Sequence, residues 1–295
     1  MQPPARSDLE AALATVPSAP LAPRTHERLG DAWSGLQRSQ PAAACYRTAM
    51  ALGGESPLLV RKLARAVELC AGASSAPLAD RDHNRCYRMA SLATFLTGIC
   101  GREDFQLLDV GGGDGLLSLY LPHAGYRLAE PDINGLRGEA LPFPSGSVDV
   151  VCACHVLEHV PPEARFDFLD ALRDRAREHL VLLNPFHVPG SGYRERLQTV
   201  VDLTGAGWAR EHLACGLPET GLIREYAESR GLTFTMEPNG AMPTAFLANL
   251  VSHYARKAGC EGDLARINRY LNSLDPAAMT NPRLPAAMLV HFPLV

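Results

Sequence analysis

The feature that most constrains the fold is the glycine-rich segment LLDVGGGDG at residues 107–115. The apolar residues before the glycines are typical of a buried strand, and the LLSLYL that follows is compatible with a helix. Gly111 and Gly113 lack the Cβ atoms that would keep a ligand away from the backbone, and they permit positive φ in a sharp turn. A helix that begins there offers free N–H groups to a polar ligand. The segment therefore predicts an α/β sheet with a ligand site after its first strand.

Two acidic side chains accompany this loop. Asp109 stands just before the glycines and can orient the loop by hydrogen bonding. Glu130 follows Asp109 by twenty-one residues, after the strand-like YRLA, where an acid can accept two hydrogen bonds from a ribose diol. The glycines read G-x-G-x-G from Gly111, and Leu116 stands where the longer G-x-G-x-x-G fingerprint needs a glycine. This spacing disfavours a dinucleotide-binding oxidoreductase.

The second half of the chain alternates strand and helix signals, which predicts a parallel sheet with helices on both faces. An amphipathic helix is predicted over 83–100, and further helices are predicted to begin at Gly115, Pro161 and Pro218. The helix from Pro161 has apolar residues every three or four positions as far as Leu180. The strand candidates are 105–110, 126–129, 148–153, 179–183, 232–237 and 287–293.

Residues 1–80 are predicted to form a small helical region ahead of the main domain at 81–295. Within it, LGDAWSGLQ and the following AAACYRTAMALGGESP resemble one tetratricopeptide unit. One such unit buries little apolar surface, and arrays need about three. The expectation is a helical cap packed on the main domain, with a protein-docking or dimer surface as the alternative. A helical insertion at about 241–275 is expected to act as a lid or a dimer contact.

Composition excludes several classes of partner. The formal net charge is −4, so no basic field exists for a nucleic-acid backbone, and no nucleic-acid partner is expected. No apolar stretch is long enough for a bilayer, and the N-terminal residues lack the pattern of a secretory signal. The eight cysteines form no paired C-x-x-C framework, which favours reduced thiols. A cytoplasmic protein without a membrane partner is therefore expected.

Four stretches, LLDVGGGDG, AEPD, GEALPFPSGSVDVV and CHVLEHVP, occur in this order within residues 104–185. With them the sequence resembles the class I S-adenosylmethionine (SAM)-dependent methyltransferases. It is most similar to the small-molecule group that includes the ubiquinone-biosynthesis enzymes. The resemblance implies a Rossmann-like sheet, SAM as methyl donor and S-adenosylhomocysteine as product. It also implies transfer of the methyl group to an O, N or C atom of a small molecule.

The resemblance also implies a cofactor site. The glycines line the methionine part of SAM, Glu130 binds the ribose, residues 139–141 lie along the adenine, and Cys154 with His155 lies under the sulfonium. The family usually has a helix and a third strand before the adenine contacts, and PDINGLRGEA (131–140) is expected to reduce both. The residues expected to contact SAM are Arg88, Asp109, Gly111, Gly112, Gly113, Glu130, Pro131, Asp132, Glu139, Ala140, Leu141, Cys154 and His155.

Three histidines are candidates for a general base. Methyl transfer from a sulfonium requires alignment above all, and a base is needed only if the acceptor must lose a proton. His155, His159 and His187 stand at or just past predicted strand ends, where open α/β sheets bind ligands. The alternative for each is a structural role or a passive place in the pocket wall.

The acceptor is expected to lie against residues 186–230, which are rich in aromatic side chains and arginine. Such a surface could receive a planar or acidic small molecule. The residues expected on the substrate side are Asn184, Phe186, His187, Tyr193 and Trp208.

The segment CACHVLEH also resembles a metal-ligand cluster, through Cys152, Cys154, His155 and His159. Strand alternation places the two cysteines on one face and His155 on the other, so a tetrahedral zinc site would need a break in the strand. No metal is therefore expected. Two alternatives to methyl transfer remain open, namely another SAM-binding reaction on the same fold and a partner-binding protein with a degenerate SAM fold.

Overall fold

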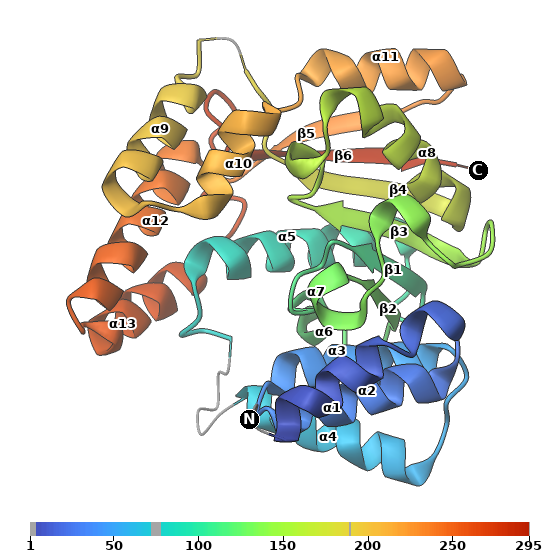
Figure 1. The fold of residues 1–295 in the computed structure, drawn as a ribbon. Helices are drawn as coiled ribbons and strands as arrows, with labels where there is room; N and C mark the ends of the chain where they lie inside the picture. The colour runs from blue at the N-terminus through green and yellow to red at the C-terminus, as the bar shows by residue number, and fades with distance from the viewer. Residues whose placement is uncertain (1–3, 72–77, 189, 295) are drawn as a thin grey trace.

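The computed structural model describes residues 4–71, 78–188 and 190–294, and a six-stranded sheet flanked by helices forms its centre (Figure 1). The strand order is β2-β1-β3-β4-β6-β5. β1 to β4 run parallel, and β6 is antiparallel to both β4 and β5. The strands are β1 (Gln106–Val110), β2 (Gly125–Ala129), β3 (Val148–Cys154), β4 (Ala176–Asn184), β5 (Thr235–Asn239) and β6 (Ala287–Pro293). The predicted Rossmann-like α/β class is confirmed.

The helices fall into an N-terminal group, a group that connects the strands, and a pair inserted between β5 and β6. The α-helices are α1 (Pro4–Leu13), α2 (Pro23–Gly35), α3 (Ser39–Ala51), α4 (Pro57–Ala71), α5 (His83–Cys100), α6 (Leu117–Tyr120), α7 (Pro131–Asn134), α8 (Arg165–Arg175), α9 (Tyr193–Thr204), α10 (Gly207–Cys215), α11 (Thr220–Arg230), α12 (Met242–Lys257) and α13 (Glu261–Asn272). Short 3-10 turns are η1 (Val16–Ser18), η2 (Gly138–Ala140), η3 (Leu157–His159) and η4 (Pro162–Ala164).

The central strand β3 is buried along its whole length. It lies between β1 and β4 in the apolar core, as parallel strands covered on both faces do. The helix predicted from Pro161 is shorter than expected, because α8 ends at Arg175 and Ala176 begins β4. Ala176 pairs with Val148, and Leu180 pairs with Val151. The prediction that Leu180 belongs to the helix is wrong.

The N-terminal helices cover the free edge of the sheet at β2 (Figure 1). The Leu128 N–H of this edge strand donates to Thr48 Oγ1 at 3.1 Å, which satisfies a backbone donor that would otherwise lack a strand partner. Arg127 donates to the Ala51 carbonyl oxygen at 2.8 Å. Trp33 of α2 donates to the carbonyl oxygen of Ile133 in α7 at 2.9 Å.

Within this region α2 and α3 pack against each other. Gly30 of α2 lies against the ring of Tyr46 in α3 so closely that a Cβ atom would overlap it. Residues 1–3 and 72–77 of the predicted N-terminal region lie outside the described residues. The domain boundary at residue 80 and the docking role of these helices stay predictions.

The insertion between β5 and β6 consists of α12 and α13, which pack on α5. Asn84 of α5 donates to the Ala245 carbonyl oxygen at 2.9 Å, and the His83 N–H donates to Asn268 Oδ1 at 3.3 Å. The insertion is thus held against the helix that precedes the sheet. No helix among the described ranges has the length and apolar character needed to cross a membrane.

A contact between two histidines joins β4 to β6 and makes stability depend on pH. His291 Nε2 lies 3.2 Å from His179 Nδ1. Burial and the neighbouring His179 lower the pKa of His291 from 6.5 to about 4. The unfolded chain therefore binds this proton at higher pH, and stability is lost as pH falls from 6.5 towards about 4. We expect His291→Gln to reduce the loss of unfolding free energy between pH 7 and pH 5 by about 1–2 kcal/mol in urea titrations.

The matched control is His123→Gln, because the His123 side chain is 67% exposed. This variant should lose as much stability between the two pH values as the wild type. An equally large loss in His291→Gln would contradict the assignment.

Candidate functional site

The chain turns sharply after Val110, and the turn depends on glycine. Gly111 has φ of +70°, and a Cβ atom there would overlap Val156 in the turn after β3. A Cβ atom on Gly112 would overlap the carboxylate of Asp109. Gly113 has φ of +56° and nothing within 4 Å of where its Cβ would be. The corner is therefore packed on its inner side and open at Gly113, as a ligand loop requires.

Glu130 points to this corner from the end of β2. Its Oε2 accepts the Gly113 N–H at 2.9 Å, and its Oε1 accepts the Asp132 N–H at 3.5 Å. Burial raises the pKa of Glu130, whereas these backbone donors lower it. Pro131 and Asp132 stand beside it, exposed at the start of α7. The carboxylate is thus placed beside the open glycine, and its contact with the ribose of SAM stays a prediction.

Asp109 supports the corner in a different way from the one predicted. It is buried, accepts the Tyr126 hydroxyl at 2.7 Å, and lies 3.6 Å from Cys152 Sγ. Burial raises the pKa of Asp109 to about 6. Its hydrogen bonds in the described structure run to these two side chains, and Asp109 meets the loop by packing under Gly112. The prediction that Asp109 orients the loop by a hydrogen bond is therefore not met among the described residues.

The predicted adenine contacts lie in η2 and just after it. Glu139 and Ala140 are exposed, and Leu141 is buried in the apolar core. Between β2 and β3 the chain forms only α7 and η2, so the third strand of the family is absent from this part of the described chain. The expected reduction is present, and the contacts of these three residues with SAM stay a prediction.

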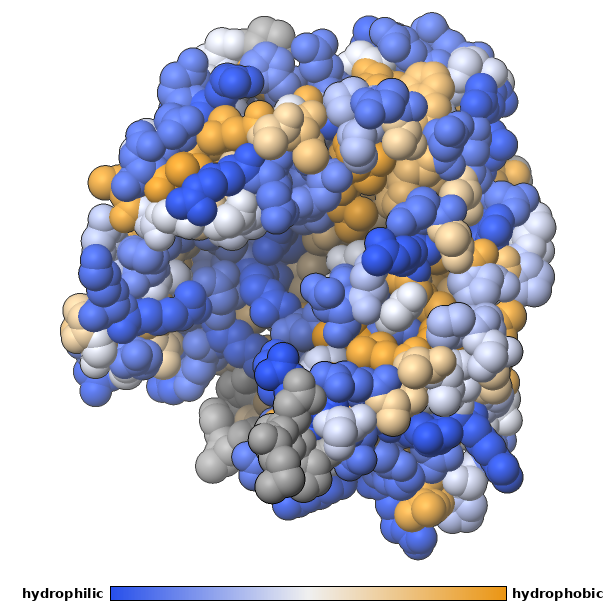
Figure 2. All heavy atoms as spheres, in the orientation of Figure 1, coloured by the Kyte–Doolittle hydropathy of each residue, from blue (hydrophilic) through white to orange (hydrophobic). Residues whose placement is uncertain are grey.

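A cavity of about 550 Å³ lies between α5, the turn after β3, α9, α10 and the start of α12. Figure 2 shows the surface hollowed between the α9, α10 and α12 side of the molecule and the end of the sheet. The predicted site residues in its wall are Arg88, His155, His159, Tyr193 and Trp208.

Besides the residues of the glycine corner, Glu130 and its neighbours, and the adenine contacts, four further predicted residues stand outside the wall of this cavity. Asn184 is buried and donates from Nδ2 to Glu158 Oε2. Phe186 belongs to the apolar core, and Cys154 is buried at the end of β3. His187 forms a backbone bridge to the segment before α11. The structure thus separates His187 from the other two histidine candidates.

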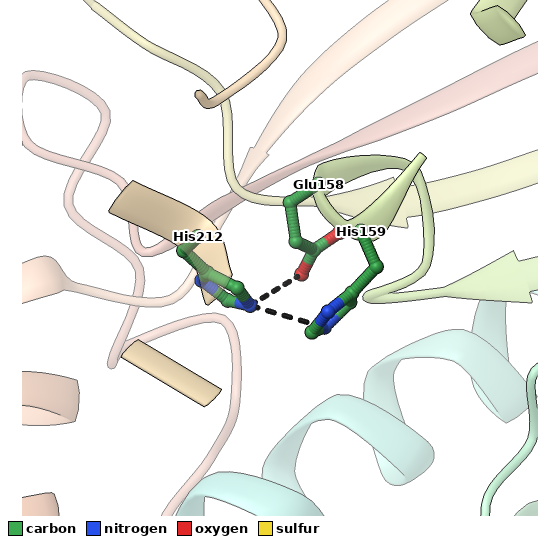
Figure 3. Close-up of side chains that lie close together, drawn as sticks. All are labelled: Glu158, His159 and His212. Atoms are coloured by element: carbon green, nitrogen blue, oxygen red, sulfur yellow. Dashed lines mark hydrogen bonds and ion pairs between the residues drawn. The ribbon is translucent and has the colours of Figure 1, made fainter. Parts of the chain in front are cut away.

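Glu158, His159 and His212 form a compact cluster (Figure 3), and His159 and His212 also line the cavity. His159 Nε2 lies 3.1 Å from His212 Nε2, and His212 Nε2 lies 3.7 Å from Glu158 Oε1. Burial lowers the pKa of His212 to about 4, so its imidazole is uncharged at neutral pH. His155 Nδ1 lies 3.1 Å from Glu158 Oε1.

The backbone at the start of this cluster is strained. His155 has φ of +58°, in the left-handed region that non-glycine residues seldom adopt. Its N–H donates to the Leu183 carbonyl oxygen at 2.8 Å, which keeps the residue attached to the end of β4. Strain of this kind persists only where the surroundings enforce it, and it occurs often at functional sites. The turn thereby ends β3 and brings Glu158 and His159 to the cavity.

Two members of this site, His212 and Arg196, lie in the stretch 186–230 that is expected over the acceptor but are not among the predicted site residues. His212 lies in the stretch expected over the acceptor, but its contact with His159 depends on how α10 docks against η3. Arg196 of α9 also lines the cavity. Helical spacing from Tyr193 could have indicated this, because residues three apart lie on one helix face.

Comparison with known proteins finds one matching family model and several solved structures of low sequence identity. Residues 108–177 match the family described as a methyltransferase domain. The plantazolicin methyltransferase BpumL in complex with S-adenosylhomocysteine is 9% identical, with 90% of this chain and 98% of that chain covered and a TM-score of 0.45. The YcgJ protein from Bacillus subtilis is 12% identical, with 68% of this chain and 97% of that chain covered and a TM-score of 0.42. A SAM-dependent methyltransferase from Thermotoga maritima is 12% identical, with 70% of this chain and 91% of that chain covered and a TM-score of 0.43. No curated protein matches the chain.

The matched segment contains the glycine corner, Glu130 and the turn with Glu158 and His159. The chain carries a class I methyltransferase domain, as the motifs predicted. It is an enzyme of the SAM-dependent methyltransferase class, with SAM as methyl donor and S-adenosylhomocysteine as product. The tetratricopeptide resemblance and the similarity to the ubiquinone-biosynthesis group stay predictions.

The open side of Gly113 gives a direct test of the cofactor site. We expect Gly113→Arg to abolish SAM binding in calorimetric titrations, because its side chain would fill the space beside Glu130. Gly146→Arg is the matched control: Gly146 has φ of +60°, is equally open, and lies before β3 at the opposite end of the strands. Both variants carry a similar backbone penalty of roughly 1–2 kcal/mol. SAM affinity that falls equally in both variants would refute the placement.

Removal of the Glu130 carboxylate should weaken SAM binding without closing the site. We expect Glu130→Ala to lose about 1–3 kcal/mol of SAM binding free energy, because the ribose hydroxyls lose their acceptor. Glu103→Ala, at an exposed acid before β1, should bind SAM as the wild type does. A wild-type dissociation constant for Glu130→Ala would point to another acid.

Proposed function

We propose that the enzyme methylates a small acidic molecule with a planar part, held in the 550 Å³ cavity, at an O, N or C atom. The volume falls within the range of about 300–1,000 Å³ typical of small-molecule sites. The cavity lies at the carboxyl end of the parallel strands, where open α/β sheets bind ligands. These features favour a small molecule over a macromolecule as acceptor.

The observation that carries the acidic character is the charge of the cavity wall. Among the four arginines that line it, Arg85 pairs with Asp114 at 2.5 Å and Arg256 approaches Asp82 at 3.9 Å. The other two, Arg88 and Arg196, have no ion-pair partner among the described residues. Each carries a full positive charge at neutral pH. Two unpaired guanidinium groups facing one cavity favour anionic groups on what it binds.

We assign the two arginines to different ligands. Arg88 lies on α5, the helix that also reaches the glycine corner through Arg85 and Asp114, so Arg88 is suited to the carboxylate of SAM. Arg196 lies on α9, near Tyr193 and the acceptor side. Arg196 is thus suited to an acidic group on the acceptor, with Tyr193 and Trp208 against its planar part.

The residues proposed to bind SAM lie at the glycine corner after β1 and at the end of β2. Gly111–Gly113 would take the methionine part of SAM and Glu130 its ribose, with Pro131 and Asp132 beside the ribose. When bound, SAM supplies a methyl group activated by its sulfonium. The protein's own task is to orient the acceptor and to exclude water from the cavity. His155 and His159 line the cavity and remain base candidates for an acceptor that must lose a proton, whereas His187 does not reach it.

Product analysis tests this proposal. Incubation with SAM and a panel of aromatic acids should release S-adenosylhomocysteine in equal amount with a methylated acid. Amides of the same acids should be poor acceptors, because they cannot pair with Arg196. Methylthioadenosine in place of S-adenosylhomocysteine would indicate another SAM reaction on this fold, and equal rates for acids and amides would refute the acidic acceptor.

The Arg196→Gln substitution should weaken binding of the acceptor and leave binding of SAM unchanged. We expect KM for an acidic acceptor to rise about 10- to 100-fold, as the loss of a charge-assisted hydrogen bond predicts, with an unchanged dissociation constant for SAM. Arg194→Gln is the matched control, because Arg194 lies on the same helix but is exposed and outside the cavity wall. Arg196→Lys should restore part of the affinity. An Arg196→Gln enzyme with the wild-type KM would exclude this role.

A further inference from the structure

The cluster of Glu158, His159 and His212 is built around a buried carboxylate, that of Glu158. Glu158 is fully buried, and no lysine or arginine pairs with it among the described residues. Its ion-pair contacts are the imidazoles of His155 and His212. Burial of a carboxylate without a cation is costly, and buried charges are usually paired or bound to metal.

Unsatisfied polar atoms gather at the same place. A buried polar atom without a hydrogen-bond partner is uncommon in a folded protein and calls for an explanation. Around this carboxylate the described structure has four such atoms: Glu158 Oε1, Asn184 Oδ1, His155 Nε2 and His212 Nδ1. Glu158 Oε1 is one of the three atoms that face one another in the cluster. Of these four atoms, Glu158 Oε1 is the one that a cation bound by the cluster would contact.

The spacing of the three ligand atoms fits a single metal ion. His159 Nε2 and His212 Nε2 lie 3.1 Å apart, and all three ligand atoms lie within 4.8 Å of one another. Two nitrogens bound to one zinc ion at about 2.0–2.1 Å, at a tetrahedral angle, lie about 3.3–3.4 Å apart. The two imidazoles therefore need to move only a few tenths of an ångström, about 0.2–0.3 Å, to share an ion.

The surroundings of His159 also suit a metal ligand. Its Nδ1 lies 3.1 Å from Glu211 Oε2, and the exposed Glu211 carboxylate can accept the Nδ1 proton. Such a carboxylate fixes the tautomer in which Nε2 carries a free lone pair, as in many zinc sites. His159 and His212 both line the cavity, which leaves further coordination positions open to a ligand.

We propose that Glu158, His159 and His212 bind one divalent transition-metal ion of the zinc type in the wall of the cavity. Two imidazoles and one carboxylate suit zinc and its first-row neighbours, whereas magnesium and calcium prefer oxygen ligands. Three protein ligands with an open position are typical of ions that act on a substrate. No metal was expected at CACHVLEH, because strand alternation places its two cysteines and His155 on opposite faces. The site proposed here uses neither cysteine, and its third ligand, His212, lies 53 residues beyond His159.

The role of the ion rests on the proposed function, and an ion bound to Nε2 of His159 leaves His155 as the base candidate in the cavity wall. Because it lies in the wall of the acceptor cavity, the ion would bind a heteroatom of the acceptor and lower the pKa of a hydroxyl there. Metal binding itself does not depend on that role, so the two can be tested separately.

Metal content and spectroscopy test the site directly. The full-length protein, treated with a chelator and dialysed, is titrated with Zn²⁺ and separately with Co²⁺. We expect one ion per chain and, with Co²⁺, visible absorption bands typical of low coordination number. His159→Gln, His212→Gln and Glu158→Gln should each weaken binding by on the order of 100-fold or more. Glu211→Gln keeps all three ligands and should weaken it by only about 10-fold.

The chain offers a matched control for the histidine pair. His179 and His291 have ring nitrogens 3.2 Å apart, but no carboxylate completes a ligand set there in the described chain. His291→Gln should therefore leave metal content unchanged. Zn²⁺ binding that is lost equally in His291→Gln, or that survives in all three ligand variants, would overturn the proposal, as would the absence of stoichiometric binding to the wild type. Thermal melts show whether each variant remains folded.

Activity measurements separate the two proposals. If the protein binds one ion but releases no S-adenosylhomocysteine with any acid, the proposed acceptor class fails and the metal site stands. If methyl transfer proceeds at the full rate in chelator and the protein binds no ion, the metal site fails and the proposed function stands.

Discussion

The arrangement of the whole site depends on close contact between two strand ends, which the missing Cβ of Gly111 permits. Val156 of the turn after β3 occupies the space that a side chain at Gly111 would take. The turn can then pass beside the corner after β1, with His155 held in a strained conformation. A larger residue at position 111 would push these two segments apart. The glycine therefore positions the cavity histidines as well as the cofactor corner.

The parts of the fold that sequence predicted are those with a local signal. α5 spans His83–Cys100 and β6 spans Ala287–Pro293, and both ranges agree with the prediction because periodicity and flanking residues coincide there. The helix after Pro161 was predicted too long because its apolar spacing continues through Ala176 and Leu180. Those two residues instead pair with β3, and a buried strand can carry the same apolar residues as a helix.

The parts that sequence did not predict depend on tertiary contacts. Nothing in the sequence around Thr48 indicates that its hydroxyl accepts the Leu128 N–H at the sheet edge, and the covering of β2 follows from the docking of α3. His212 likewise becomes part of a site only because α10 packs beside η3. The glycine corner and Glu130 could be predicted, since a strand, a turn and a second strand place them together within 25 residues.

α5 connects the two halves of the site. Arg85 on this helix pairs with Asp114 in the segment after the open glycine, and Arg88, one turn later, lines the cavity. The first turn of the helix is held by α12 and α13 through Asn84 and His83. An insertion far along the chain thus supports the position of a helix that touches both the cofactor corner and the acceptor cavity. This explains why helices between β5 and β6 belong to the architecture of the site, although neither carries a predicted catalytic residue.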